Sequence, residues 1–132
     1  MYLLDTDIVI YALKGRPAVV AALGKHAASP MAISVITLME LYYGAERSAS
    51  PVANRARVRT LEHEFQVLPA GVNIAATFGN LKARMAGAGT LLDDFDLIIA
   101  STALAANLTL VSNNERHFKR VEGLRLVNWA RQ

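Results

Sequence analysis

Three acidic residues stand in apolar surroundings, where a charge is costly. Asp5 directly follows the apolar segment 2–4, and Asp96 lies at the start of another apolar segment. Glu40 is the only charged residue in the segment 35–45. A carboxylate among apolar neighbours loses its hydration unless a cation or hydrogen-bond donors compensate. These three residues are therefore the candidate catalytic groups.

The chemistry that three such carboxylates suit is metal-assisted hydrolysis. If they face one site, they repel each other unless a cation neutralises them. Oxygen ligands without a nearby thiolate or imidazole favour a hard ion, Mg²⁺ or Mn²⁺. Such an ion lowers the pKa of an attacking water and offsets charge on a leaving oxygen. The pattern predicts hydrolysis of a phosphodiester.

Competing catalytic signatures are missing from the sequence. There is no cysteine, and no serine, histidine and aspartate stand in the order of a hydrolase triad. Gly87 and Gly89 follow a predicted helix, whereas a phosphate-binding loop follows a strand. His117 lies near the proposed site and is a minor candidate for contact with substrate or for proton transfer.

The elements that must position the acids alternate along the chain. Apolar runs and turn residues predict strands at 2–4, 31–35, 65–68, 108–111 and 124–127. Helices are expected from residue 8 and over 17–26, 37–46, 52–64, 73–85 and 95–106. This alternation predicts a single α/β domain with a five-stranded, mostly parallel sheet flanked by helices on both faces. Ligands bind such sheets beyond the carboxyl ends of the strands, where strand order reverses.

Three further acids near the candidates have a structural explanation. Asp7 is suited to cap the helix that begins at residue 8. Asp93 or Asp94 can serve the start of the helix near residue 95, which leaves Asp96 without a capping role. Asp96 shares a helix face with the apolar Ile99, so its side chain is expected to face inward.

Composition restricts the broad class. The chain has 132 residues, of which 53% are hydrophobic and 19% charged, with a formal net charge of +3. These values describe one folded domain without a membrane segment, and the lack of cysteine fits the cytoplasm. Basic residues gather at 55–59 and 116–120. They are candidates for contact with RNA phosphates, or are equally well explained as solvated surface.

Four motifs in order resemble PIN-domain ribonucleases of the VapC toxin type. They are Leu-Leu-Asp-Thr-Asp at 3–7, the segment 34–44, Asp-Phe-Asp-Leu-Ile-Ile-Ala at 94–100, and Leu-Val-Ser-Asn-Asn at 110–114 with Phe118. The closing segment 121–129 also resembles VapC endings. The resemblance covers the whole chain and implies one PIN domain over residues 1–132.

The resemblance also implies an activity and partners. Asp5, Glu40 and Asp96 would form an acidic triad around Mg²⁺ or Mn²⁺, with Asp5 and Asp96 as the direct metal ligands and Asn114 as a fourth polar group. The substrate would be RNA, with tRNA as one candidate. A VapB-type antitoxin would inhibit the protein by inserting a peptide toward the acids. The resemblance further implies a homodimer that meets operator DNA only through the antitoxin.

Two positions depart from the family pattern. Asp7 stands where the family often has asparagine, and Asn114 stands where a fourth acid is frequent. Because Asn114 supplies no charge, a fully occupied second metal site is not expected.

Two alternatives remain open at this stage. The start of the chain also resembles a haloacid-dehalogenase-type phosphatase, with Asp5 as nucleophile, Asp7 as general acid and the pair Asp93–Asp94 as the later acids. That interpretation leaves Glu40 unexplained. The other alternative is a catalytically silent scaffold that binds nucleic acid or an antitoxin.

Overall fold

A single sheet of five short strands forms the centre of the computed structural model, which describes residues 1–131. The strands are β1 (Tyr2–Leu4), β2 (Met31–Ser34), β3 (Gln66–Leu68), β4 (Thr109–Val111) and β5 (Arg125–Val127). All four neighbouring pairs are parallel. The sheet is thus fully parallel, where the sequence predicted a mostly parallel one.

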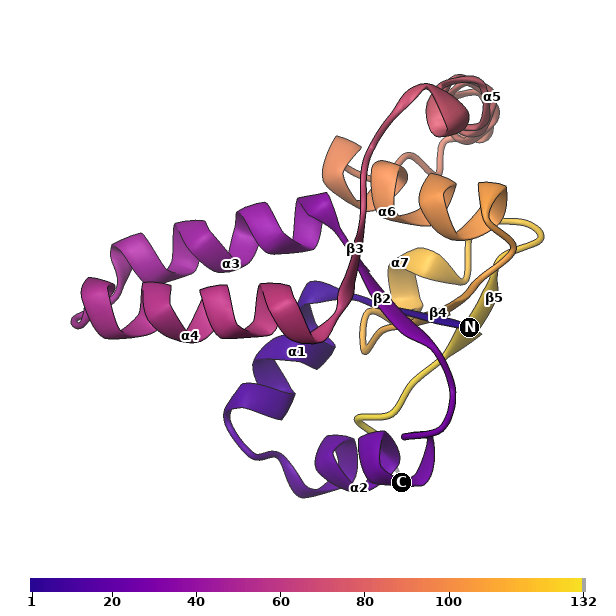
Figure 1. The fold of residues 1–132 in the computed structure, drawn as a ribbon. Coiled ribbons are helices and arrows are strands. Elements are labelled where there is room, and N and C mark those ends of the chain that lie inside the picture. The colour runs from indigo at the N-terminus through magenta and orange to yellow at the C-terminus, as the bar shows by residue number, and fades with distance from the viewer. Residues whose placement is uncertain (132) are drawn as a thin grey trace.

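Seven helices connect the strands within this part of the chain. They are α1 (Thr6–Leu13), α2 (Pro17–Lys25), α3 (Val35–Arg47), α4 (Pro51–Glu64), α5 (Val72–Ala88), α6 (Asp94–Ala105) and α7 (Glu115–Phe118). Parallel strands require such crossovers, because a tight turn cannot join two of them. Helices α3 and α4 form a hairpin that extends away from the sheet (Figure 1).

Strand order reverses at the centre of the sheet. The order is β3-β2-β1-β4-β5, so the chain leaves β1 toward β2 on one side and later returns to its other side as β4. Ligands bind α/β sheets beyond the carboxyl ends of the strands at such a point. Asp5 directly follows β1 and Ser112 directly follows β4, so both lie there.

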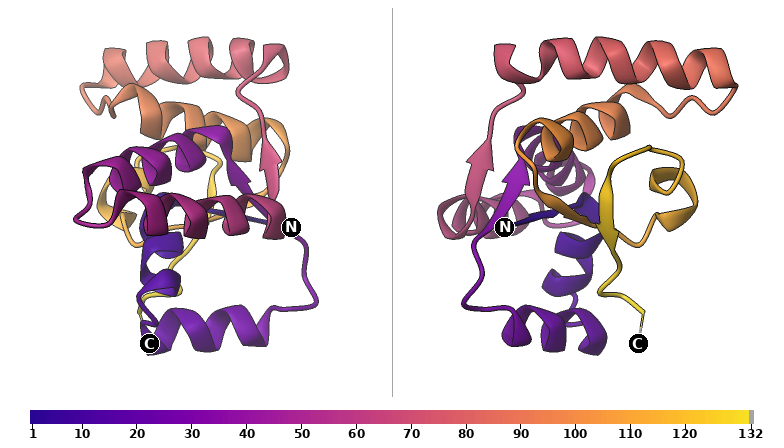
Figure 2. Two further views of the ribbon diagram at one scale, coloured as in Figure 1. Left: turned by 60° about the vertical axis from the view of Figure 1, so that its left-hand side comes forward. Right: turned by 90° about the vertical axis from the view of Figure 1, so that its right-hand side faces the viewer.

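Helices cover both faces of the sheet (Figure 2). Successive strand residues point to opposite faces. Leu3 packs into a core with side chains of α5 and α6, and its neighbour Leu4 packs into a second core with side chains of α1, α2 and α4. Both leucines are fully buried. The apolar run at 2–4 forms a strand because each of its faces has a layer of helices to bury against.

The carboxyl-terminal residues return to α2. The ring of Trp129 stacks on the ring of His26, with 4.9 Å between centroids and 2° between planes. Tyr2 meets both rings edge-on. This cluster joins the end of the chain to β1 and α2, and Figure 1 places the C-terminus beside α2.

Several details differ from the sequence-based expectation, among them the starts of α1 at Thr6 and of α3 at Val35, which are two residues earlier than predicted. Asp5, not Asp7, caps α1, because its carboxylate accepts from the amide of Thr6. The segment between the predicted strands 108–111 and 124–127, where no helix was expected, contains the short helix α7. Helix α5 continues beyond residue 85 to Ala88 and ends at Gly89, whose φ of 72° closes it in the left-handed conformation that suits glycine.

No helix in the described residues combines the length and apolar character needed to cross a membrane.

Candidate active site

A polar pocket of about 460 Å³ opens at the point where strand order reverses. It is lined by Asp5, Thr6, Asp7, Ile10, Glu40, Asp96, Asn113 and Asn114. The three carboxylates singled out in the sequence thus share one pocket with Asn114, although they come from three separate segments of the chain. We call it the acidic pocket.

Asp5 is the most buried of the acids, with 6% of its surface exposed. One carboxylate oxygen accepts from the amide of Thr6 at 2.8 Å, and the other accepts from the hydroxyl of Ser112 at 2.7 Å. The first bond is the helix cap of α1, and the second crosses from β1 to β4. These two bonds fix the carboxylate at the end of β1.

Glu40 reaches the pocket from the second turn of α3. The hydroxyl of Thr6 donates to Glu40 Oε1 at 2.7 Å, and Thr6 Oγ1 lies 3.1 Å from Thr37 Oγ1. Thr37 is fully buried one helical turn before Glu40. Only one Glu40 oxygen is engaged in this way, so the other is available to a ligand.

Asp96 faces the pocket because a neighbour takes over the capping role. The carboxylate of Asp93 accepts from the amide of Asp96 at 2.9 Å and caps α6. The Asp96 side chain is 20% exposed, and its Oδ2 lies 4.0 Å from His117 Nδ1. Ile99, on the same helix face, is buried as predicted.

The segment after β4 forms the remaining wall. Ser112 is fully buried, and its oxygen accepts from the amide of Asn114 at 2.9 Å while its hydroxyl donates to Asp5. The side chain of Asn114 lies 3.0 Å from His117 Nδ1. The amide of Asn113 donates to Asp7 Oδ2 at 3.0 Å. Ser112 therefore couples the position of Asn114 to that of Asp5.

Burial and mutual repulsion raise the pKa values of these acids. Burial, followed by the charge of Asp7, raises the pKa of Asp5 to about 7. Burial, followed by the charges of Asp93 and Glu40, raises the pKa of Asp96 to about 6. The pKa of Asp7 is also raised, chiefly by burial. A pocket in which carboxylates resist ionisation is one that a cation would stabilise.

Within residues 1–131, no three acidic or histidine side chains converge closely enough to form a ready-made metal cluster. Mg²⁺ does not require one, since it commonly binds through one or two carboxylates and keeps several waters. The carboxylate oxygens that line the pocket and the buried, unpartnered Asp7 Oδ1 fit such an ion. The residues present are therefore suited to a hydrated hard cation.

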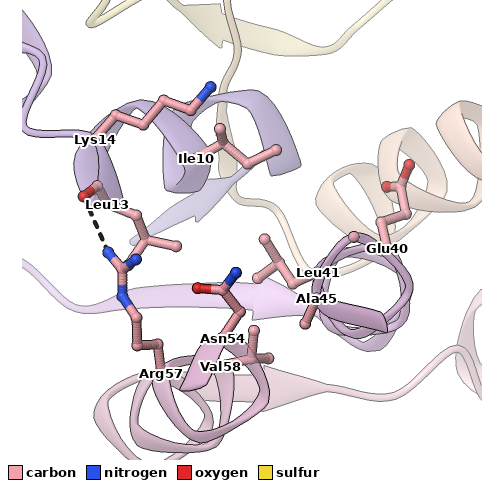
Figure 3. Close-up of a pocket in the computed structure, with 10 residues that line it drawn as sticks. Ile10, Leu13, Lys14, Glu40, Leu41, Ala45, Asn54, Arg57 and Val58 are labelled. Carbon is pink, nitrogen blue, oxygen red and sulfur yellow. Dashed lines mark hydrogen bonds between the residues drawn. The ribbon is translucent and has the colours of Figure 1, made fainter. Parts of the chain in front are cut away.

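A second hollow adjoins the acidic pocket and shares Ile10 and Glu40 with it. It has a volume of about 420 Å³ and is lined by Ile10, Leu13, Lys14, Glu40, Leu41, Gly44, Ala45, Asn54, Arg57 and Val58. Figure 3 shows apolar side chains of α1, α3 and α4 facing a common space with Lys14 and Arg57 at its edge. Arg57 Nη2 donates to the carbonyl of Leu13 at 3.3 Å. We call this hollow the apolar groove.

Several residues of the site were not identified from the sequence. Ser112, Thr6 and Thr37 hold Asp5 and Glu40 in place, yet each is a common residue beside an apolar run. The available signal was that all three lie within the family-like segments 3–7, 34–44 and 110–114. Asp7 was expected to be a helix cap and instead lines the pocket.

The arrangement also differs from a phosphatase of the haloacid-dehalogenase type. Asp93 and Asp94 lie at the start of α6 and do not end a strand. Glu40, which that mechanism does not use, lines the acidic pocket.

Comparison with known proteins gives consistent matches. Residues 2–124 match the model of the PIN domain family. Ribonuclease VapC2 of Haemophilus influenzae is 43% identical over 129 residues, which cover 98% of each chain. The tRNA(fMet)-specific endonuclease VapC of Shigella flexneri is 38% identical with the same coverage. The crystal structure of VapBC2 from Rickettsia felis bound to a promoter DNA fragment superposes with a TM-score of 0.91 at 33% identity, over 97% of this chain and 98% of that chain.

The family model spans almost the whole chain, and the relatives match it from end to end. The parallel sheet and the acids at its reversal point agree with that match. The chain therefore belongs to the PIN-domain family of VapC-type ribonuclease toxins.

Proposed function

We propose that residues 1–132 act as one Mg²⁺- or Mn²⁺-dependent endoribonuclease domain, which hydrolyses RNA phosphodiesters in the acidic pocket. The observation that carries this proposal is the buried carboxylate of Asp5, which shares the pocket with Glu40 and Asp96. The reaction class is inferred from the family to which the chain belongs, and the proposed catalytic residues are those that line the acidic pocket.

Each side chain has a role in this proposal. Asp5 and Asp96 would hold the cation, which would lower the pKa of the attacking water and offset charge on the leaving oxygen. Glu40 would serve as the base for that water through the oxygen that Thr6 leaves free. Asn114, whose backbone amide is held by Ser112, would orient a water bound to the cation.

We further propose tRNA as the substrate class. Two proteins that are 38% and 37% identical to this chain over 98% of its length, from Shigella flexneri and Salmonella typhimurium, bear the name tRNA(fMet)-specific endonuclease. An RNA substrate would carry its phosphates across the surface around the acidic pocket. Arg116 and Lys119 of the adjoining segment are both exposed and could contact them.

The test is cleavage by the purified chain, freed of any antitoxin, in Mg²⁺. We expect cleavage of tRNA and no hydrolysis of p-nitrophenyl phosphate. Asp94→Asn serves as the control, because Asp94 lies outside the pocket and pairs with Lys82. Hydrolysis of the phosphomonoester would favour the phosphatase alternative. Failure to cut any RNA would favour the silent scaffold.

The apolar groove is the proposed site of the antitoxin. A peptide along it would bury apolar side chains against Leu41 and Val58 and place its next residues beside Glu40, at the edge of the acidic pocket. A cationic side chain there would take the place of the metal ion. We propose that a VapB-type antitoxin inhibits the enzyme in this way.

The remaining proposals concern assembly and location. The Rickettsia felis homologue was crystallised as VapBC2 on promoter DNA. We propose that this chain likewise reaches operator DNA only through its antitoxin, that it forms a homodimer, and that it acts in the cytoplasm. Size-exclusion chromatography with light scattering, with and without the antitoxin, would measure the assembly.

A further inference from the structure

One polar atom in the acidic pocket has no structural explanation. Within residues 1–131, Asp7 Oδ1 is the only buried side-chain oxygen or nitrogen without a hydrogen-bond partner. Leaving a buried polar group unsatisfied costs about 1–3 kcal/mol, and more for a charged one. The unpaired oxygen of Asp7 therefore destabilises the folded state, and a ligand that binds this oxygen would offset that destabilisation.

The other oxygen of Asp7 is firmly held. Asp7 Oδ2 accepts from the amide of Asn113 at 3.0 Å. Asn113 is itself fixed, because its Oδ1 accepts from Asn128 at 3.0 Å and its Nδ2 donates to the hydroxyl of Tyr11 at 3.3 Å. Bonds from the end of the chain and from α1 thus restrain the carboxylate and leave Oδ1 in a fixed, unpaired position.

Capping does not account for this residue. Asp5 already accepts from the first amide of α1, so the capping position is filled. Asp7 lies on the first turn of that helix, where an isolated acid would gain from the helix dipole. Here it shares the pocket with Asp5, Glu40 and Asp96, so its charge is placed against three others.

We propose that Asp7 supplies a fourth carboxylate to the divalent-cation site. Position 114, where a fourth acid is frequent in the family, carries an uncharged asparagine, and Asp7 brings a carboxylate to the same pocket from the first turn of α1. The ligand is a hard divalent cation, Mg²⁺ or Mn²⁺, which Asp7 contacts directly or through a bound water. This inference rests on the proposed function, because it assumes a cation at Asp5 and Asp96.

The test is direct binding of Mn²⁺ to the full chain, measured by isothermal titration calorimetry without RNA. Asp7→Asn removes the charge and keeps an oxygen that can accept from Asn113. Asp94→Asn is the matched control, since it removes the same charge two residues from Asp96 and outside the pocket. We expect Asp7→Asn to weaken Mn²⁺ binding by about 10- to 100-fold. Asp94→Asn should remain within about twofold of wild type.

A second readout is the rise in Tm on adding Mn²⁺, which should be smaller for Asp7→Asn than for wild type. If circular dichroism shows that Asp7→Asn is unfolded, Asp7→Ser removes the same charge and takes its place. Equal Mn²⁺ affinity in wild type and the Asp7 variant, with RNA cleavage intact, would overturn this inference alone. A wild-type chain that binds no Mn²⁺ would overturn both this inference and the proposed metal-dependent function.

Discussion

The acidic pocket and the apolar groove lie side by side and share two residues, yet they are built in opposite ways. The pocket gathers desolvated carboxylates that raise one another's pKa. The groove gathers apolar side chains of three helices, with basic residues only at its edge. Glu40 and Ile10 belong to both.

The two hollows therefore affect the free energy of folding differently. Ionised carboxylates in the pocket destabilise the folded state unless a cation neutralises them. The groove is instead formed by side chains that also pack in the core. Leu41, Ala45 and Val58 are at least 94% buried and belong to one core cluster. Changes in the pocket should therefore trade activity against stability, and changes in the groove should alter a partner's affinity.

The largest predicted effect is on the stability of the metal-free protein. The pKa of Asp5 is about 7 in the folded chain and 3.8 ordinarily, so the folded state holds this proton more tightly than the unfolded state. The associated stability is present below about pH 4 and is lost as pH rises to 7. Asp5→Asn avoids that loss, and its unfolding free energy at pH 8 should exceed that of wild type by on the order of 4 kcal/mol.

Chemical denaturation between pH 4 and pH 8, in EDTA, measures this difference. It should grow with pH and shrink when Mn²⁺ is added to the wild type. A gain in unfolding free energy for Asp5→Asn that does not change with pH would contradict the idea that the ionised carboxylate destabilises the pocket.

The variant Gly44→Leu tests whether the apolar groove binds the antitoxin. A Cβ atom at Gly44 would meet no other atom within 4 Å, and Gly44 lines the groove, so a leucine introduced there should extend into it. We expect the affinity for the cognate antitoxin to fall about 10- to 100-fold, which is about 1.4–2.7 kcal/mol. The rate of tRNA cleavage by the free enzyme is measured beside it. Loss of cleavage with unchanged antitoxin affinity would indicate that the groove serves RNA cleavage and does not bind the antitoxin.

A smaller effect is expected at Ser112, which positions Asp5. Ser112→Ala removes the donor to Asp5 Oδ2 and the acceptor of the Asn114 amide. We expect RNA cleavage to fall about 10-fold, with the rising limb of its pH profile moved to higher pH, because the lost bond favours the ionised carboxylate.

Ser101→Ala is the matched control for this change. Ser101 is also fully buried, but its hydroxyl donates to the carbonyl of Leu97 inside α6. Its pH profile should match that of wild type. An equal loss in both variants, with unshifted profiles, would mean that Ser112 acts only through stability.

The smallest effect concerns a region outside both hollows. His26→Ala removes the ring stacked on Trp129 and should lower the unfolding free energy by about 1 kcal/mol. His63→Ala, at an exposed position on α4, should leave it unchanged. Thermal denaturation of the two variants gives the comparison. A change in cleavage by His26→Ala with unchanged stability would show that this cluster reaches the active site.

Much of the fold could be predicted from the chain because local patterns and global topology agree. The alternation of apolar runs and helices predicted the α/β class, and the structure and the family match confirm it. Asp5 and Asp96 could be located because each carries a charge at the junction of a strand or loop with a helix. Asp93 caps α6, as the spacing allowed, and leaves Asp96 to face the pocket.

The remainder depends on contacts that no local pattern encodes. Asp5 takes the cap expected of Asp7 because it is the single residue between the end of β1 and the start of α1. The role of Ser112 arises only when β4 pairs beside β1. The groove exists because the α3–α4 hairpin packs against α1, which is a relation between helices distant in sequence. Helix α7 has only four residues, too few for a periodic signal.

If the proposal is right, the desolvated carboxylates support RNA cleavage only when a divalent cation is bound. The most direct test is the titration of EDTA-treated wild type and Asp96→Asn with Mn²⁺ while tRNA cleavage is followed. We predict no cleavage by wild type without metal and a saturable rise with Mn²⁺. We also predict a loss of more than about 100-fold in Asp96→Asn, since outer-shell partners alone contribute about 10- to 100-fold. Undiminished cleavage in EDTA, or an Asp96→Asn variant as active as wild type, would contradict the proposal.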